Sequence, residues 1–229
     1  MSYVKPDSKK DYALILGASS GFGEVTAVEL SKIGFNILGI HLDRGSGLIK
    51  VFFHSLAFGS LAPFIHRDPK ERLSAKQMDM TLNVMAHSLV YWSRELLDAD
   101  LLARGTKIYA MTSSGSARVT PYYGAVSAAK AALESHSRQL ALELAPYEIT
   151  VNCIRAGVTF TPALRKIPGH ETMIDQALSQ IPFKRLTQPL DIAKFIVAQV
   201  TSDELWATGN VFNLDGGEFS VAFHTPLKK

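Results

Sequence analysis

The sequence predicts a single α/β domain built on a doubly wound parallel sheet. Short apolar runs without polar alternation recur along the chain, which is typical of strands buried on both faces of a parallel sheet. The first run is followed by a glycine-rich turn and then by a stretch with helical period. The chain has 229 residues, of which 47% are hydrophobic and 20% charged, so residues 1–229 are sufficient for one large domain with a sizeable core.

The first strand, turn and helix have the features of a Rossmann-type dinucleotide site. Residues 12–16 are predicted as the strand and residues 24–33 as the helix. A side chain at Gly17 or Gly21 would keep the backbone from approaching a diphosphate, and the amides at a helix N-terminus bind such an anion. A tight turn made of small residues is the alternative. The turn residues that we assign to cofactor binding are Gly17, Ser19, Ser20, Gly21, Phe22 and Gly23.

Residues 35–40 are predicted as the second strand, whose end normally lies beside the adenosine ribose. His41, Asp43 and Arg44 follow it. An acid there favours the free ribose hydroxyl of NAD, whereas a base favours the additional phosphate of NADP. His41 rather than an acid stands nearest the end of the strand, so NADP(H) is favoured with Arg44 as the phosphate partner, and NAD(H) remains the alternative.

The connection after the second strand is too short for a parallel sheet. Residues 48–53 are predicted as another buried strand, a few residues after Arg44. A parallel crossover needs about a dozen residues or more, usually including a helix, and the chain from Arg44 to Lys50 extends at most about 20 Å. We therefore expect one strand-helix unit to be missing between Arg44 and Leu48.

Three strands and three helices are predicted in the rest of the chain. Asn83, in the middle of the first of these helices, is expected to be buried and to need a partner, as a backbone brace or as part of a proton relay. Residues 162–186, with a helical patch at 171–180, are predicted to form a lid, and the tail after Phe223 is expected to be loose. The strands are residues 107–112, 149–154 and 211–214, and the helices are residues 74–101, 122–145 and 190–201.

Two residues of the predicted helix 122–145 suggest proton-transfer chemistry. Tyr123 and Lys130 are seven positions apart, about two helical turns, so their side chains share a face. A lysine in that place is expected to keep positive charge near the phenol and to lower its pKa. Ser113 follows the strand at 107–112, at the edge where open parallel sheets bind ligands, and its hydroxyl suits a substrate carbonyl. The alternative is an ordinary amphipathic helix whose Tyr and Lys are unrelated.

Composition argues against several other classes of protein. The net charge of +3 is mild and no dense run of Lys and Arg occurs, so a nucleic-acid partner is not expected. The lone Cys153 lies in an apolar run and is expected to be buried as a free thiol, which favours a cytoplasmic protein. No apolar run reaches membrane-spanning length and no signal core precedes residue 11. The seven histidines lack the spacing of a metal site.

The chain resembles the short-chain dehydrogenase/reductase superfamily over nearly its whole length. The commoner members have three residues between the tyrosine and the lysine, whereas six separate Tyr123 from Lys130, as in the branch that contains the enoyl-acyl-carrier-protein reductases. The segments that begin at His54, Pro121 and Arg155 also resemble that branch. Two departures are Leu16, where threonine is common, and Ser113, where many enoyl reductases carry a second tyrosine and ketone reductases carry serine.

The resemblance implies an NAD(P)H-dependent enoyl-thioester reductase of type II fatty-acid synthesis. Tyr123 would stabilise the enolate oxygen and Lys130 would hold the nicotinamide ribose, with Ser113 assisting at the same oxygen. The expected substrate is a thioester of acyl-carrier protein or CoA, the expected assembly a homotetramer. A second set of residues is implied for cofactor binding: Ser55, Ala57, Lys130, Gly157, Thr159 and Thr161.

Two other functions stay open at this point. The first is a carbonyl or 3-oxoacyl-thioester reductase that uses Ser113 and Tyr123 on a C=O bond. The second is a non-catalytic dinucleotide-binding protein. Basic residues flank the predicted lid, and they either bind an acidic carrier protein or are simply exposed to solvent. They are Arg165, Lys166, Lys184 and Arg185.

Overall fold

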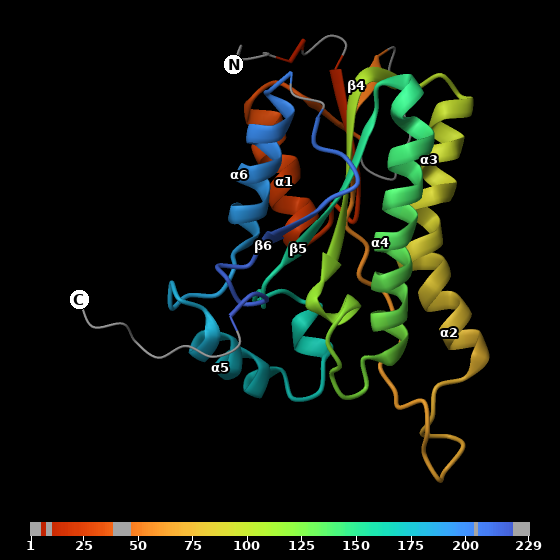
Figure 1. The fold of residues 1–229 in the computed structure, drawn as a ribbon, viewed down its shortest axis with the longest axis vertical. Helices are drawn as coiled ribbons and strands as arrows, with labels where there is room; N and C mark the ends of the chain where they lie inside the picture. The colour runs from red at the N-terminus through yellow and green to blue at the C-terminus, as the bar shows by residue number, and fades with distance from the viewer. Residues whose placement is uncertain (1–5, 8–10, 39–46, 204–205, 222–229) are drawn as a thin grey trace.

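The computed structural model describes residues 6–7, 11–38, 47–203 and 206–221. These residues form one parallel sheet of six strands covered by helices on both faces (Figure 1). The strand order is β2-β1-β3-β4-β5-β6, so the predicted doubly wound α/β fold is confirmed. The strands are β1 (Asp11–Leu16), β2 (Asn36–Leu38), β3 (Leu48–His54), β4 (Leu102–Ser113), β5 (Thr150–Ala156) and β6 (Val211–Leu214).

Helices α1 (Gly21–Lys32) and α6 (Pro189–Val200) cover one face of the sheet. Their buried side chains, such as Leu30 and Ile192, pack with Ile15 and Phe53 from the strands. Strands between two helical layers are buried on both faces, which explains the mainly apolar runs of the sequence. Helix α6 begins with a proline at its first position and a reciprocal capping bond between its N-cap and Asp191.

The opposite face carries α4 (Gly124–Leu144) and a long helical segment formed by α2 (Ala75–Leu82), a π-turn at Asn83–His87 and α3 (Ser88–Asp98). The segment starts at a capping box formed by Ser74 and Gln77. The predicted helix 74–101 therefore begins at the expected place but ends at Asp98, and it is interrupted by the π-turn.

The expectation that Asn83 is buried is wrong. The side chain of Asn83 is exposed, because the π-turn directs Met85 and Ala86 into the core instead. A solvated amide needs no internal partner, so neither the bracing role nor the relay role has support from its burial.

Strand β3 lies beside β1, on the side away from β2, in parallel register from Asp11 opposite Leu48 to Leu16 opposite His54. Strand β1 therefore lies between β2 and β3, as the sequence indicates. The suspected missing unit, between Arg44 and Leu48, falls on residues 39–46, which lie outside the described residues. Within the described part of the chain, β2 and β6 are the two edge strands.

The carboxyl ends of the strands meet at one edge of the sheet, beside the start of α4 and near α5 (His170–Gln180), at the bottom of Figure 1. Helix α5 coincides with the helical patch expected within the lid region. The tail after Phe223 lies outside the described residues. No helix of the described part is both long and apolar enough to cross a membrane.

Candidate active site

A cavity of about 210 Å³ opens at the carboxyl edge of the sheet, between α4, the glycine turn and the start of the lid region. Its walls come from segments far apart in the sequence, which the parallel topology brings to one edge. Nine of the residues assigned from the sequence line this cavity: Phe22, Ser55, Ala57, Ser113, Tyr123, Lys130, Gly157, Thr159 and Thr161.

The phenol of Tyr123 lies against Gly115 and is hydrogen-bonded to Ser113. A Cβ atom at Gly115 would stand 2.6 Å from Cε1 of Tyr123, so only glycine leaves room for the ring. Ser113 and Gly115 belong to the end of β4 and the short turn Ser114–Ser116, which places a hydroxyl and a phenol at one point of the cavity. This pair of donors is suited to an oxygen that gains negative charge.

The predicted effect of Lys130 on the phenol is wrong. Burial raises the pKa of Tyr123, and the hydrogen bond from Ser113 opposes that rise without cancelling it. Desolvation disfavours the phenolate more than the nearby serine favours it. Tyr123 is therefore a protonated donor over the ordinary pH range in the free protein, and its role does not depend on a lowered pKa.

Lys130 lies in the same cavity with only 5% of its surface exposed. Its Nζ atom donates hydrogen bonds to the main-chain oxygens of Met111, at 2.7 Å, and Leu56, at 3.4 Å. Burial lowers its pKa to about 8, while the negative charge of the Glu134 carboxylate acts in the opposite direction. The ammonium is thus fixed at the floor of the cavity before any ligand binds.

The glycine turn packs tightly against the loop after β3. A Cβ atom at Gly17 would lie 2.3 Å from the main-chain oxygen of Ser55, and one at Gly23 would lie 2.2 Å from the oxygen of Gly17. Gly17 also has a φ of +88°, in the left-handed region that favours glycine. At Gly21 a Cβ atom would come 3.7 Å from Thr161, so the turn adjoins the cavity wall.

These contacts fit a dinucleotide whose diphosphate rests on the amides at the start of α1 and whose nicotinamide end reaches Lys130. They also change the reason for two of the glycines. Gly17 and Gly23 must lack a side chain because the protein itself packs against them, whether or not a diphosphate is bound. Ser19 and Ser20 are exposed and do not line the cavity. His41 and Arg44, assigned to the adenosine end, lie outside the described residues.

His54, at the end of β3, is a buried residue of this region that the sequence analysis gave no role. Its Nε2 lies 2.8 Å from the Ser88 hydroxyl, and that hydroxyl donates to the Val84 oxygen in the π-turn. Ser88 must therefore accept from the imidazole, which places the ring proton on Nε2. Complete burial and the nearby Lys130 charge lower the pKa of His54 to about 3, so the ring is neutral.

One wall of the cavity is apolar, which no local motif of the sequence indicates. These side chains come from the loop after β3, the π-turn, α4 and the lid region, so only the tertiary fold brings them together. An acyl group of modest size would be shielded from water here. The apolar residues of this wall include Leu56, Leu61, Met85, Val126, Leu164, Ile167 and Met173.

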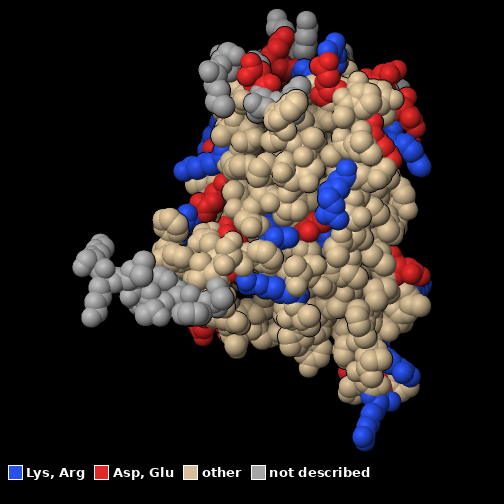
Figure 2. Space-filling view, viewed as in Figure 1, with Lys and Arg blue, Asp and Glu red and all other residues tan. Residues whose placement is uncertain are grey.

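The basic residues that flank the lid region differ in their surroundings. Lys166 lines the cavity, and the guanidinium of Arg165 stacks over Phe160 at 4.6 Å. Arg185 forms an ion pair with Asp191, and Lys184 donates to the oxygen of Ser179. On the face drawn in Figure 2, basic and acidic side chains are mixed, without a continuous basic field.

The lone cysteine lies away from solvent, in the core of the fold. Cys153 is fully buried, as predicted, and burial raises its pKa to about 11. Among the residues that the structure describes, no group of three or more His, Cys, Asp or Glu side chains could hold a metal ion.

Residues 41–218 match a family model described as "Enoyl-(Acyl carrier protein) reductase". The enoyl-acyl-carrier-protein reductase (NADH) of Aquifex aeolicus is 27% identical over 183 residues, covering 77% of this chain and 64% of the relative. Its solved structure superposes with a TM-score of 0.80 at 22% identity, over 94% of this chain and 98% of that one. At that identity, the structural likeness shows the fold.

Two other relatives act on different bonds, by their names. A (2S)-((R)-hydroxy(phenyl)methyl)succinyl-CoA dehydrogenase subunit of Thauera aromatica is 28% identical over 243 residues, covering 90% of this chain and 95% of the relative. A 3-oxoacyl-acyl-carrier-protein reductase of Buchnera aphidicola is 26% identical over 245 residues, covering 92% and 98%. Both alignments are longer than the 229 residues of this chain, so both relatives carry residues that this chain lacks.

Proposed function

This chain belongs to the short-chain dehydrogenase/reductase family, and from that premise we propose that it is an NAD(P)H-dependent enoyl-thioester reductase of type II fatty-acid synthesis. The observation that carries the proposal is the joint placement of Tyr123 and Lys130, with six residues between them in sequence, in one cavity with an apolar wall. The family makes the chain an NAD(P)H-dependent oxidoreductase. What we propose beyond the family is that the protein reduces a C=C bond of its substrate.

A bound NAD(P)H would supply hydride to the β-carbon of the enoyl group. The residues assigned to hold it are those of the glycine turn together with Ser55, Ala57, Gly157, Thr159 and Thr161, and Lys130 at the nicotinamide ribose. NADP(H) remains the favoured form, with Arg44 as the phosphate partner, because His41 rather than an acid follows the second strand in the sequence, and NAD(H) is the alternative. The side chains of the protein then act on one oxygen atom of the substrate, the thioester carbonyl oxygen.

Negative charge collects on the thioester oxygen when a C=C bond conjugated to it is reduced. Tyr123 is protonated, because burial raises its pKa, and so it can donate a hydrogen bond or a proton to that oxygen. Ser113, hydrogen-bonded to the phenol, can donate to the same oxygen. Lys130 adds positive charge from the cavity floor, where its ammonium is held by the main-chain oxygens of Met111 and Leu56.

The apolar wall gives the acyl chain a place away from water. Residues 162–186 are proposed to close over it as a lid, since they carry Leu164, Ile167 and Met173 of that wall. Lys166 also lines the cavity, and it suits the acidic part of a carrier thioester. We further propose that the protein is cytoplasmic, works as a homotetramer and takes acyl-carrier protein or CoA thioesters.

A 3-oxoacyl-thioester or other carbonyl reductase is the second candidate. It is favoured by Ser113, which stands beside Tyr123 where many enoyl reductases carry a second tyrosine, and by the likeness to the Buchnera aphidicola reductase. In that reaction Tyr123 would protonate the alkoxide that forms from the ketone.

Turnover with two thioesters separates these functions. The protein would be incubated with NADPH or NADH and with either crotonyl or acetoacetyl thioester, and cofactor oxidation would be followed at 340 nm, the reduced nicotinamide band. Oxidation with the enoyl substrate supports the proposal, and oxidation with the keto substrate alone supports the second candidate. Cofactor binding without turnover of either substrate would identify a non-catalytic dinucleotide-binding protein.

A further inference from the structure

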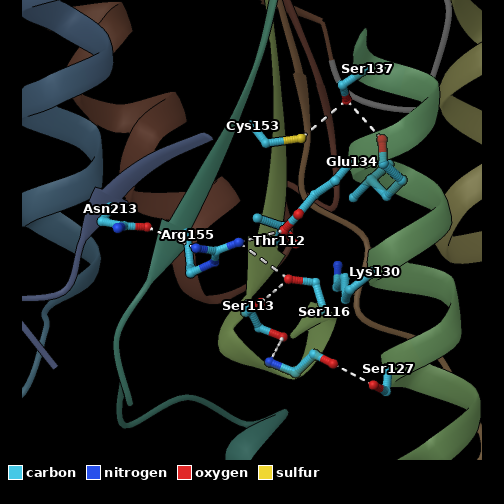
Figure 3. A network of polar contacts seen from close by, with 12 residues as sticks. Thr112, Ser113, Ser116, Ser127, Lys130, Glu134, Ser137, Cys153, Arg155 and Asn213 are labelled. Carbon is cyan, nitrogen blue, oxygen red and sulfur yellow. Dashed lines mark hydrogen bonds and ion pairs between the residues drawn. The ribbon is translucent and has the colours of Figure 1, made fainter. Parts of the chain in front are cut away.

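A buried ion pair lies directly behind the residues of the candidate active site (Figure 3). Glu134 is one helical turn beyond Lys130 on α4, and its Oε1 atom lies 3.1 Å from Nη2 of Arg155 on β5. The two side chains are only 13% and 9% exposed. The same carboxylate oxygen accepts a hydrogen bond from the Thr112 hydroxyl on β4, at 2.7 Å. One carboxylate thus joins a helix and two strands.

The partners of Glu134 lead to the main chain of the Ser113 turn. Thr112 is the residue immediately before Ser113. Arg155 donates through Nη2 to the Ser116 hydroxyl at 3.3 Å, and that hydroxyl donates to the Ser113 oxygen at 3.0 Å. Arg155 also donates from Nη1 to Asn213 on β6, at 3.1 Å. The turn is therefore fixed on both sides of Ser113 by groups that meet at the carboxylate.

We propose that Glu134 is a positioning residue for the reduction: its carboxylate fixes the Ser113 turn through Thr112 and Arg155, and it keeps an anion beside the ammonium of Lys130. This inference rests on the proposed function, since it assigns Glu134 a part in the same reaction. Glu134 does not line the cavity, so it would act through its neighbours and not on the substrate.

The electrostatic part of the inference depends on every ionisable group around Lys130. The His54 ring is neutral, since burial lowers its pKa to about 3, and the Cys153 thiol is uncharged, since burial raises its pKa to about 11. Tyr123 stays protonated for the same physical reason. Glu134 then remains as the anion that raises the pKa of Lys130 against burial. The ionisable groups around Lys130 are Tyr123 at the N-cap of α4, Glu134 on α4, His54 on β3, and Cys153 and Arg155 on β5.

A buried ion pair can also serve only to hold the fold, and many such pairs contribute little even to stability. A purely structural role would make Glu134 variants less stable, with a loss of activity that is the same at every pH. A positioning role with an electrostatic part predicts a loss that grows as the pH rises through the pKa of Lys130. The pH profile therefore distinguishes the two roles.

The test is Glu134→Gln, which keeps the shape and an acceptor for Thr112 but removes the charge. The control is Glu143→Gln on the same helix. The Glu143 carboxylate is exposed and accepts a hydrogen bond from the exposed side chain of Gln139. Two quantities would be measured: kcat/KM for NADPH from pH 6 to 10, and the titration midpoint of the Lys130 side chain by ¹³C NMR of labelled lysine. The resonance would be assigned with Lys130→Arg.

Glu134→Gln is expected to lower the Lys130 midpoint by about one pH unit, the low end of the effect of one nearby opposite charge. From a midpoint of about 8, this would reduce kcat/KM about fivefold at pH 8 and little at pH 6. Glu143→Gln should change neither quantity. An unmoved midpoint together with a loss of equal size at both pH values would overturn the inference.

Two further outcomes are informative. If the wild-type protein oxidises NADPH with neither thioester while Glu134→Gln still lowers the midpoint, the proposed function fails and the effect of Glu134 on Lys130 stands. If Glu134→Gln does not fold, the unpaired guanidinium is the physical cause, and Glu134→Gln combined with Arg155→Met removes it. The double variant loses a cation as well as the anion, so its midpoint is expected to be lowered by less than one pH unit, and a wild-type midpoint in it would refute the electrostatic part of the inference.

Discussion

The Nζ atom of Lys130 lies 2.7 Å from the main-chain oxygen of Met111, two residues before Ser113 on β4. The same ammonium donates to the oxygen of Leu56, on the loop after β3. A buried lysine with two fixed acceptors and a lowered pKa is poised between its charged and neutral forms near neutral pH. The behaviour of the protein in mildly alkaline solution should therefore report on this one residue.

We expect kcat/KM for NADPH to decline above about pH 8, because Lys130 loses its proton there and its positive charge with it. The decline should follow one ionisation, since Tyr123 stays protonated at that pH. Lys130→Arg keeps a positive charge throughout, so its activity, although lower, should not decline at that pH. An identical alkaline decline in Lys130→Arg would show that another group is responsible.

Tyr123→Phe removes only the phenol oxygen, the atom proposed to donate to the substrate oxygen. We expect kcat to fall about 10²- to 10⁴-fold, the usual contribution of a general acid, while the Kd of NADPH changes little. Tyr122→Phe is the matched control, because its neighbouring ring is 48% exposed and does not line the cavity. Steady-state kinetics and quenching titrations would measure both. A similar kcat in Tyr123→Phe and the wild type would rule out the assigned role.

The sequence was sufficient for most of the sheet and for the placement of Tyr123 and Lys130 in one cavity, because both have local signals. An unbroken apolar run identified β1, and mainly apolar runs identified β3 and β5. A spacing of about two helical turns predicted that Tyr123, now seen to be the N-cap of α4, and Lys130 lie close together. The burial of Asn83 was predicted wrongly because a π-turn changes which side of a helix faces the core. The apolar spacing of the sequence did not indicate that turn.

The protonation of Tyr123 was misjudged for a different reason. The sequence shows that a lysine is near but not how deeply the phenol is buried, and burial here outweighs charge. The apolar wall, the His54–Ser88 contact and the Glu134–Arg155 pair escaped notice because each joins residues more than twenty positions apart. Pairings of that kind follow from topology, which sequence periodicity specifies only in outline.

The glycine turn should tolerate no side chain at Gly17. Gly17→Ala combines a positive φ with a Cβ atom 2.3 Å from the Ser55 oxygen, whereas Gly105→Ala has a similar φ of +81° and no atom within 4 Å of the new methyl. Both variants carry the left-handed strain of about 1–2 kcal/mol, and Gly17→Ala should lose a further ~1–3 kcal/mol from overpacking.

Urea unfolding would measure this difference, and NADPH titration should show weaker binding for Gly17→Ala than for Gly105→Ala. Equal unfolding free energies for the two variants would contradict the packing role of Gly17. Equal affinities, with unequal stabilities, would limit that role to the fold and leave the diphosphate contact without support.

Gly115→Ala tests whether the position of the phenol, apart from its chemistry, matters. The new methyl would lie 2.6 Å from Cε1 of Tyr123 and 3.2 Å from the Ser113 hydroxyl, so the ring must move away from Ser113. A displacement of about 1 Å from the reacting atom can cost about 10²-fold in rate. We therefore expect kcat to fall by roughly that factor, with the Kd of NADPH nearly unchanged.

Gly124→Ala provides the matched control for this prediction. Its methyl would lie 2.5 Å from the ring of Phe64, which is 49% exposed and can swing into solvent. Each variant thus forces one aromatic ring to move, but only Tyr123 lines the cavity. If both variants lose activity equally, the loss reflects general disturbance at the start of α4. If only Gly115→Ala loses activity, the distance between the phenol and Ser113 is itself part of catalysis.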